Sequence, residues 1–259
     1  MPIVIFSCIF SLLVLLGCRA SPDTLGRVLD AGVLRVGMDA SFPPFEYVDG
    51  AGNLVGFDVD MAWEMARRMG DRLPDDREMA VQFVANLPYD GLYDALTAQR
   101  VDVVVSALYV DDARRATHAF SAPYFDAGQV LVAAGGVTGT DDLAGRTLAV
   151  EWGSEGDVTA RAWERRIGDL TILPAQTAAE ALAWAASGQA DAALVDHLSA
   201  WGATGAGSGL RVVGEPVTSV PYAIAARIED GRLIRYLNEL LAEMEADGTL
   251  EALRVRWFR

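Results

Sequence analysis

The sequence predicts an α/β fold made of two similar lobes with mostly parallel sheets. Short β-like runs alternate with segments of helical periodicity along the chain, a pattern typical of βαβ units. The alternation recurs, because Asp102 and Asp191 each open an apolar strand just after a helical segment. Apolar residues make up 52% of the 259 residues, which is enough for a folded core and argues against disorder.

The strands and helices follow from local patterns taken in chain order. In residues 57–69, Met61, Met65 and Met69 recur at helical spacing, and residues 49–53 have the chemistry of a hairpin turn. Residues 21–26 are polar and predict a tether. Apolar runs predict strands at 34–38, 81–84, 102–106, 130–134, 147–150, 171–173, 192–195, 211–213 and 222–226. Helical spacing predicts helices at 57–69, 91–98, 155–166, 178–187, 233–246 and 249–257.

Ligands of such folds bind beyond the carboxyl ends of the strands, in a crevice. We therefore expect the segments that directly follow predicted strands to face this crevice. These segments are 39–46, 106–114, 151–156 and 196–197.

The charge of the chain excludes some classes of partner. There are 36 Asp and Glu residues against 21 Lys and Arg, a formal charge of −15, and this field repels phosphate backbones. We therefore expect no nucleic-acid partner. The only histidines and cysteines, Cys8, Cys18, His118 and His197, have no paired spacing, which excludes a zinc site of four His/Cys ligands. We predict no metal and no cofactor, and neither histidine is assigned a catalytic role.

The N-terminus indicates export. Residues 3–16 form a nearly unbroken apolar run of about 14 residues, shorter than the ~20 that span a bilayer and suited to a signal peptide. The run closes with Leu15, Leu16, Gly17 and Cys18, which resembles the bacterial lipobox, whose cysteine is lipidated. We expect residues 1–17 to be a signal peptide and 18–33 a lipid-anchored tether, with the protein outside the cytoplasmic membrane. No Lys or Arg precedes the run, and a plain cleaved signal or a short anchor is the alternative.

Several short motifs occur in a fixed order, none of them specific alone. They are Leu34 to Gly37, Asp39 to Tyr47, Gly56 to Asp60, Tyr89 to Leu92, Asp102 to Val104, Phe120 to Tyr124, Gly128 to Leu131, Ala246 to Leu250, and Trp257 with Phe258. Together they resemble the extracellular solute-binding proteins, family 3, of polar amino acid ABC transporters, over about residues 34–258.

The resemblance implies a periplasmic-binding-protein-like fold, with two βαβ lobes joined by a two-strand hinge. Lobe 1 would comprise residues 34–127 and 222–259, and lobe 2 residues 128–221. The lobes would close on an amino acid, and the protein, as a monomer, would deliver it to the permease of an ABC importer. Some members are instead parts of sensory proteins or act as periplasmic dehydratases, so both classes remain alternatives.

The resemblance also assigns roles to single residues. Arg114 matches an arginine that grips the ligand α-carboxylate through two parallel hydrogen bonds, and Asp196 matches an aspartate that receives the α-ammonium. The alternatives are a surface arginine beside Arg115 and a helix N-cap at Asp196.

Four further residues match positions in the same pocket. Phe42 occupies the place of an aromatic ring over the ligand side chain, and Tyr89 lines the pocket with Asp39 beside it. Ser154 matches the first hydroxyl of a Gly-Thr-Thr turn, and its backbone N–H at the start of a helix could bind a carboxylate.

Four positions depart from the family pattern. Ala107 and Tyr109 lie in a segment that is usually Gly-Met-Thr-x-Thr, so a bulky phenol takes the place of a small hydroxyl. Glu155 replaces the second threonine of the turn, and Glu151 stands where an apolar pocket residue is usual.

These acidic substitutions leave one cation, Arg114, against four carboxylates in the expected cleft. Closing the lobes over unpaired charge is costly, so we predict a basic or amine-bearing ligand whose cation Phe42 or Tyr89 holds by a cation–π contact. The alternative is that Glu151 and Glu155 point to solvent. A dehydratase that recruits either glutamate as acid or base is the rival function.

Overall fold

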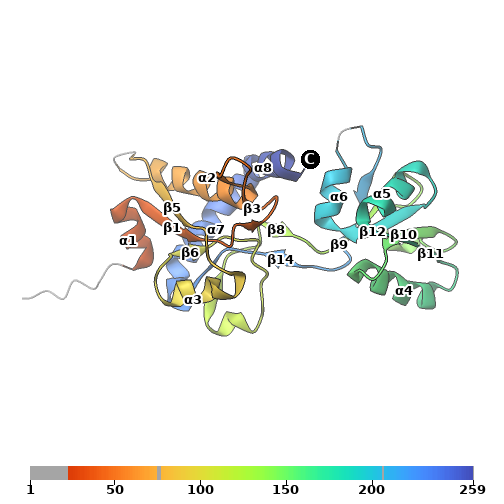
Figure 1. Cartoon of the computed structure of the whole chain (residues 1–259), viewed down its shortest axis with the longest axis horizontal. Coiled ribbons are helices and arrows are strands. Elements are labelled where there is room, and N and C mark those ends of the chain that lie inside the picture. The colour runs from red at the N-terminus through yellow and green to blue at the C-terminus, as the bar shows by residue number, and fades with distance from the viewer. Residues whose placement is uncertain (1–22, 75–76, 206, 259) are drawn as a thin grey trace, which may run out of the picture.

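Two five-stranded sheets organise the chain, one in each lobe (Figure 1). The computed structural model describes residues 23–74, 77–205 and 207–258. The first sheet has the strand order β5-β1-β6-β15-β7, the second has the order β11-β10-β12-β9-β13, and a two-stranded pair, β14-β8, runs between them. This arrangement confirms the predicted fold class.

In the sheet of lobe 1, four strands run in one direction and one runs against them. The strands are β1 (Val33–Gly37), β5 (Ala80–Val84), β6 (Val103–Val104), β7 (His118–Phe120) and β15 (Ala225–Arg227), and β15 runs antiparallel to β6 and β7. The helices are α1 (Thr24–Ala31), α2 (Phe57–Asp71), α3 (Leu92–Thr97), α7 (Gly231–Ala246) and α8 (Thr249–Phe258). Met61, Met65 and Met69 of α2 are fully buried, as the helical spacing predicts.

A small antiparallel sheet stands beside the first one. Its strands are β2 (Ser41–Phe42), β3 (Glu46–Val48) and β4 (Leu54–Val55). The predicted turn at residues 49–53 joins β3 to β4, where Asp49 accepts hydrogen bonds from the backbone N–H groups of Ala51 and Asn53.

Lobe 2 has a core on each face of its sheet. The strands are β9 (Gln129–Ala133), β10 (Thr147–Glu151), β11 (Thr171–Ala175), β12 (Ala192–Asp196) and β13 (Arg211–Val213), and the helices are α4 (Glu155–Ile167), α5 (Ala178–Ser187) and α6 (His197–Ala203). In β10, Ala149 packs with α5 on one face, whereas Leu148 and Val150 pack with α4 on the other. Both faces are covered, so the three inner strands, β9, β10 and β12, are largely apolar and buried.

The two aspartates of the internal repeat have equivalent structural roles. Asp102 accepts the backbone N–H of Arg35 (3.0 Å) and pairs with its guanidinium (2.6 Å). Asp191 accepts the N–H of Thr147 (2.8 Å) and pairs with Arg146 (3.0 Å). In each lobe the aspartate therefore ties the start of one parallel strand to its neighbour.

The expected tether over residues 18–33 is too long. Asp23 caps helix α1, Gly32 ends it in the left-handed conformation, and Leu25 and Val28 pack into the core of lobe 1. The prediction was wrong here because Leu25 and Val28, three residues apart on one face of a helix, are surrounded by polar residues that hide the helical pattern. Residues 24–31 belong to the folded domain.

The hinge consists of β8 (Phe125–Asp126) and β14 (Pro221–Tyr222). Asp126 fastens it, since one carboxylate oxygen accepts the N–H groups of Gly128 and Val220 (both 2.8 Å) and the other accepts the Ser219 hydroxyl (2.6 Å). The predicted strand at 222–226 is two strands in the structure, because the chain leaves the hinge before it enters the first sheet as β15. No helix of the described residues is long and apolar enough to cross a membrane.

Candidate functional site

A cavity of about 380 Å³ lies beside the hinge, on the side of lobe 1. Five predicted site residues line it: Asp39, Phe42, Tyr89, Ala107 and Tyr109. They come from separate segments, namely the loop after β1, strand β2, the 3₁₀ helix η1 (Tyr89–Gly91), and the segment after β6. The fold therefore brings together residues that lie far apart in the sequence.

The cavity also contains residues that were not predicted individually as site residues. They are Ser41, Glu46, Ser106, Val220 and Tyr222. Ser41, Glu46 and Ser106 lie in the segments 39–46 and 106–114 that were expected to face the crevice, but nothing in the sequence distinguished a pocket role from a structural one for each of them. Val220 and Tyr222 belong to the hinge segment, and no local sequence pattern predicts that this segment lies beside the cavity.

Three large aromatic side chains of the cavity are exposed. Phe42, Tyr89 and Tyr109 keep 43%, 45% and 47% of their surface accessible, and Tyr222 of the hinge is half-buried. Phe42 is held in place by stacking on the buried Phe45, with ring centroids 5.7 Å apart and planes 5° apart. Aromatic faces grouped around a half-buried carboxylate, Asp39, can hold an organic cation.

Arg114 does not line the cavity in this structure. It lies in the 3₁₀ helix η2 (Arg114–Ala116), is exposed, and its guanidinium carbon stands 4.6 Å from the centre of the Tyr93 ring. Tyr93 is in α3, one helical turn from Tyr89. Within the described residues the guanidinium has no ion pair, so a change of side-chain rotamer is open to it.

The predicted residues of lobe 2 stand at the carboxyl ends of its strands. Glu151 ends β10, and Ser154 caps α4 by accepting the N–H of Asp157 (3.2 Å). The N–H of Ser154 donates to the carbonyl of Glu151 (3.2 Å), so in this structure it is not available to a carboxylate. Glu155 is the first residue of α4 and is exposed.

Close packing brings the start of α4 to the ends of these strands. A Cβ on Gly156 would stand 2.8 Å from the side-chain oxygen of Gln129 and 2.9 Å from the carbonyl of Leu194. Only glycine fits this contact without displacing β9 or β12. Gly156 thus determines how closely α4 approaches the strand ends, although it has no functional side chain.

Asp196 ends β12 and caps α6. Its two oxygens accept the N–H (2.8 Å) and the hydroxyl (2.7 Å) of Ser199, which confirms the alternative N-cap reading. The carboxylate is half-buried, and each oxygen has a further lone pair, so its ligand role stays a prediction.

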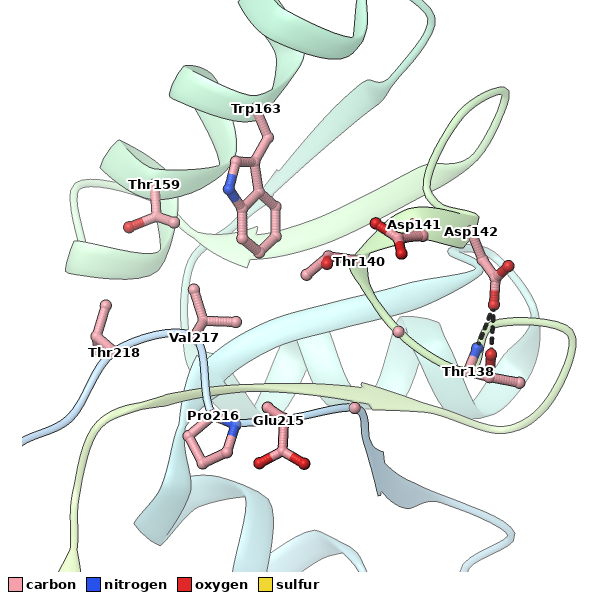
Figure 2. Close-up of a pocket in the computed structure, with 12 residues that line it drawn as sticks. Thr138, Thr140, Asp141, Asp142, Thr159, Trp163, Glu215, Pro216, Val217 and Thr218 are labelled. Atoms are coloured by element: carbon pink, nitrogen blue, oxygen red, sulfur yellow. Dashed lines mark hydrogen bonds between the residues drawn. The ribbon is translucent and has the colours of Figure 1, made fainter.

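A second cavity, of about 610 Å³, lies wholly in lobe 2 (Figure 2). Trp163 of α4 faces it from one side and Glu215 and Pro216 from another, while Asp142 accepts hydrogen bonds from the N–H (2.8 Å) and hydroxyl (2.7 Å) of Thr138. None of the predicted site residues lines this cavity. The cavity beside the hinge is therefore the candidate ligand site.

Comparison with known proteins agrees with this fold. The family model for bacterial extracellular solute-binding proteins, family 3, matches residues 34–259. The chain is 30% identical over 244 residues to the L-cystine-binding protein TcyJ of Escherichia coli (strain K12), covering 92% of this chain and 87% of that one. It is 29% identical over 239 residues to the lysine/arginine/ornithine-binding periplasmic protein of the same organism, covering 87% of each.

A solved structure of an ancestral cyclohexadienyl dehydratase superimposes with a TM-score of 0.75 at 25% identity, covering 92% of this chain and 97% of that one. The family model covers both lobes and the hinge, and its relatives are amino acid binding proteins of ABC transporters. The chain belongs to the bacterial extracellular solute-binding proteins of family 3.

Proposed function

We propose that this protein captures a basic or amine-bearing amino acid between its lobes and delivers it to the permease of an ABC importer. The observation that carries the proposal is the cavity beside the hinge, where Asp39 stands among the rings of Phe42, Tyr89 and Tyr109. No Lys or Arg is among the described residues that line it. One of the relatives is a lysine/arginine/ornithine-binding protein, which supports the same ligand class.

Each end of such a ligand would meet a group of opposite charge. The side-chain cation lies against Asp39 and an aromatic face, where a cation–π contact contributes up to about 2 kcal/mol once water is removed. The α-carboxylate is paired with Arg114 and the α-ammonium with Asp196. Closure of the lobes would add Glu151, Ser154 and Glu155 from lobe 2.

A competition series tests the ligand class. Purified protein is loaded with labelled L-arginine and challenged with lysine, ornithine, cystine, glutamate and leucine, and the label retained is measured. We expect lysine and ornithine to compete at least tenfold better than glutamate and leucine, because they carry a second cation without a second carboxylate. Glu151→Gln should weaken binding of the basic amino acids and leave the others unchanged. Preference for cystine, glutamate or leucine would reject the basic ligand.

A dehydratase is the second candidate, favoured by the likeness to the ancestral cyclohexadienyl dehydratase. Such an enzyme needs an acid and a base near a leaving hydroxyl, and Glu151 and Glu155 are at the crevice side of lobe 2. Incubation with prephenate or arogenate, followed by chromatography, decides between the two functions. Formation of product, abolished in Glu151→Gln or Glu155→Gln, would identify an enzyme, whereas recovery of unchanged compound agrees with a binding protein.

We also propose a lipid anchor at Cys18, which lies outside the described residues. The lipobox resemblance of Leu15, Leu16, Gly17 and Cys18 supports it. Cys18→Ala should move the protein from the detergent fraction to the soluble envelope fraction, measured by immunoblot of separated cell fractions. Retention of the variant in the membrane would show that residues 3–16 are an uncleaved anchor.

A further inference from the structure

Two acidic side chains are buried together at the candidate ligand site, where Glu46 lines the cavity and Asp58 does not. Glu46 of β3 is 1% exposed and Asp58 of α2 is 0% exposed. The titratable groups facing them from neighbouring elements are acids and phenols, and no cation stands among these described residues. They are Asp39 after β1, Tyr89 of η1, Tyr124 before β8, and Tyr222 of β14.

Hydrogen bonds show how this pair is accommodated. The Ser106 hydroxyl donates to one oxygen of Glu46 (2.7 Å), while Asp58 accepts the N–H of Ala107 (2.6 Å) and the Tyr124 hydroxyl (2.9 Å) through one oxygen. The other oxygen of each carboxyl is buried and meets no donor among the described residues. A proton on Glu46 would supply a donor to this pair, whose two unpartnered oxygens are buried.

The hydrogen bonds of Glu46 and Asp58 connect these side chains to two segments that line the cavity. Ser106, while donating to Glu46, accepts the N–H of Asp39 (3.0 Å). Asp58 holds the N–H of Ala107, whose φ of 39° lies in the left-handed region that alanine rarely adopts. The next residue but one, Tyr109, carries an exposed ring of the cavity. Releasing Glu46 or Asp58 would therefore free the two segments that present Asp39, Ala107 and Tyr109.

We propose that Glu46 and Asp58 are positioning residues that share one proton, fasten these two segments, and thereby set the affinity of the cavity for its ligand. This inference rests on the proposed function, since it takes the cavity as the ligand site. Burial, and then the charge of Asp58, raise the pKa of Glu46 to about 10, and burial raises the pKa of Asp58 to about 7. Both shifts favour retention of a proton by the pair.

The proton makes a specific prediction about stability. In the unfolded chain a glutamate has a pKa near 4.3, so above neutral pH the folded protein holds a proton that the unfolded chain has released. The stability that Glu46 contributes is therefore lost as pH rises. The unfolding constant increases about tenfold for each pH unit. Glu46→Gln keeps the hydrogen bonds without the proton, since its amide donates to Asp58 and its carbonyl accepts from Ser106.

The first measurement is denaturant unfolding of wild type and Glu46→Gln from pH 7.5 to 9. We expect the ratio of their unfolding constants, wild type over variant, to rise about 30-fold across this range. The matched control is Glu215→Gln, an exposed glutamate of lobe 2, which should keep the wild-type slope. Parallel slopes for wild type and Glu46→Gln would overturn the shared proton.

The second measurement is the affinity for L-arginine at pH 7.5 by calorimetry. We expect Glu46→Ala to bind at least tenfold more weakly than wild type, because alanine frees Ser106 and removes the carboxyl that would donate to Asp58. Tyr124→Phe, which removes a donor to Asp58 outside the cavity, should weaken binding at least threefold and serves if Glu46→Ala does not fold.

Wild-type affinity in Glu46→Ala or in Tyr124→Phe would overturn the positioning role. If wild type does not bind L-arginine, the proposed ligand class is rejected. The affinity series then uses the amino acid that binds in the competition experiment, while the pH slopes decide on the proton independently.

Discussion

Replacing Arg114 by alanine should weaken binding of the amino acid by about 2 to 4 kcal/mol, roughly 30- to 1,000-fold in Kd. A guanidinium that donates two hydrogen bonds to a carboxylate is hard to replace, and its loss leaves the ligand's charge unpaired in a closed cleft. In the structure Arg114 rests on the Tyr93 ring and is exposed, so the variant should fold normally. Calorimetric titration with L-arginine measures the effect.

The neighbouring arginine provides a matched control. Arg115 pairs with Asp112 (3.0 Å) and lies over the Phe120 ring, away from the cavity, so Arg115→Ala should bind as wild type. Arg114→Lys should recover only part of the affinity, because an ammonium cannot donate the two parallel bonds. Equal affinity of Arg114→Ala and Arg115→Ala would reject the assignment made from the family resemblance.

Replacing Arg227 by methionine should destabilise the fold by about 3 to 5 kcal/mol. Arg227 and Asp230 form an ion pair (2.7 Å) in which both side chains are 5% exposed. The guanidinium also donates to the carbonyls of Leu96 and Val101 (both 3.0 Å). Methionine would leave Asp230 as a buried unpaired charge, so the melting temperature should fall by on the order of 10 °C, measured by calorimetry.

An exposed arginine of the same lobe serves as the control. Arg232 pairs with Asp23 (3.0 Å), and the two side chains are 63% and 43% exposed, so the pair is worth less than about 1 kcal/mol. Arg232→Met should therefore melt close to wild type. A double variant, Arg227→Met with Asp230→Leu, should recover much of the loss if the cost comes from the unpaired charge.

The sequence alone determined the fold class and most of the elements. Apolar runs and helical spacing are local properties, so strands such as β10 and helices such as α2 and α4 were predicted within a few residues. The repeat at Asp102 and Asp191 indicated two lobes because each aspartate opens a strand. The family motifs further pointed to Asp39, Phe42 and Tyr89, which do line one cavity.

Only the tertiary structure decided which charges are buried and which are paired. Glu46 and Asp58 are 12 positions apart in the sequence, and nothing there indicates that they are buried together, yet β3 and α2 bring both into the interior beside the cavity. Asp196 accepts two hydrogen bonds from Ser199. The guanidinium of Arg114 lies over the Tyr93 ring and not in the cavity. A pattern of residue types reports local periodicity, whereas the protonation and partners of a side chain depend on desolvation and on neighbours that are distant in the chain.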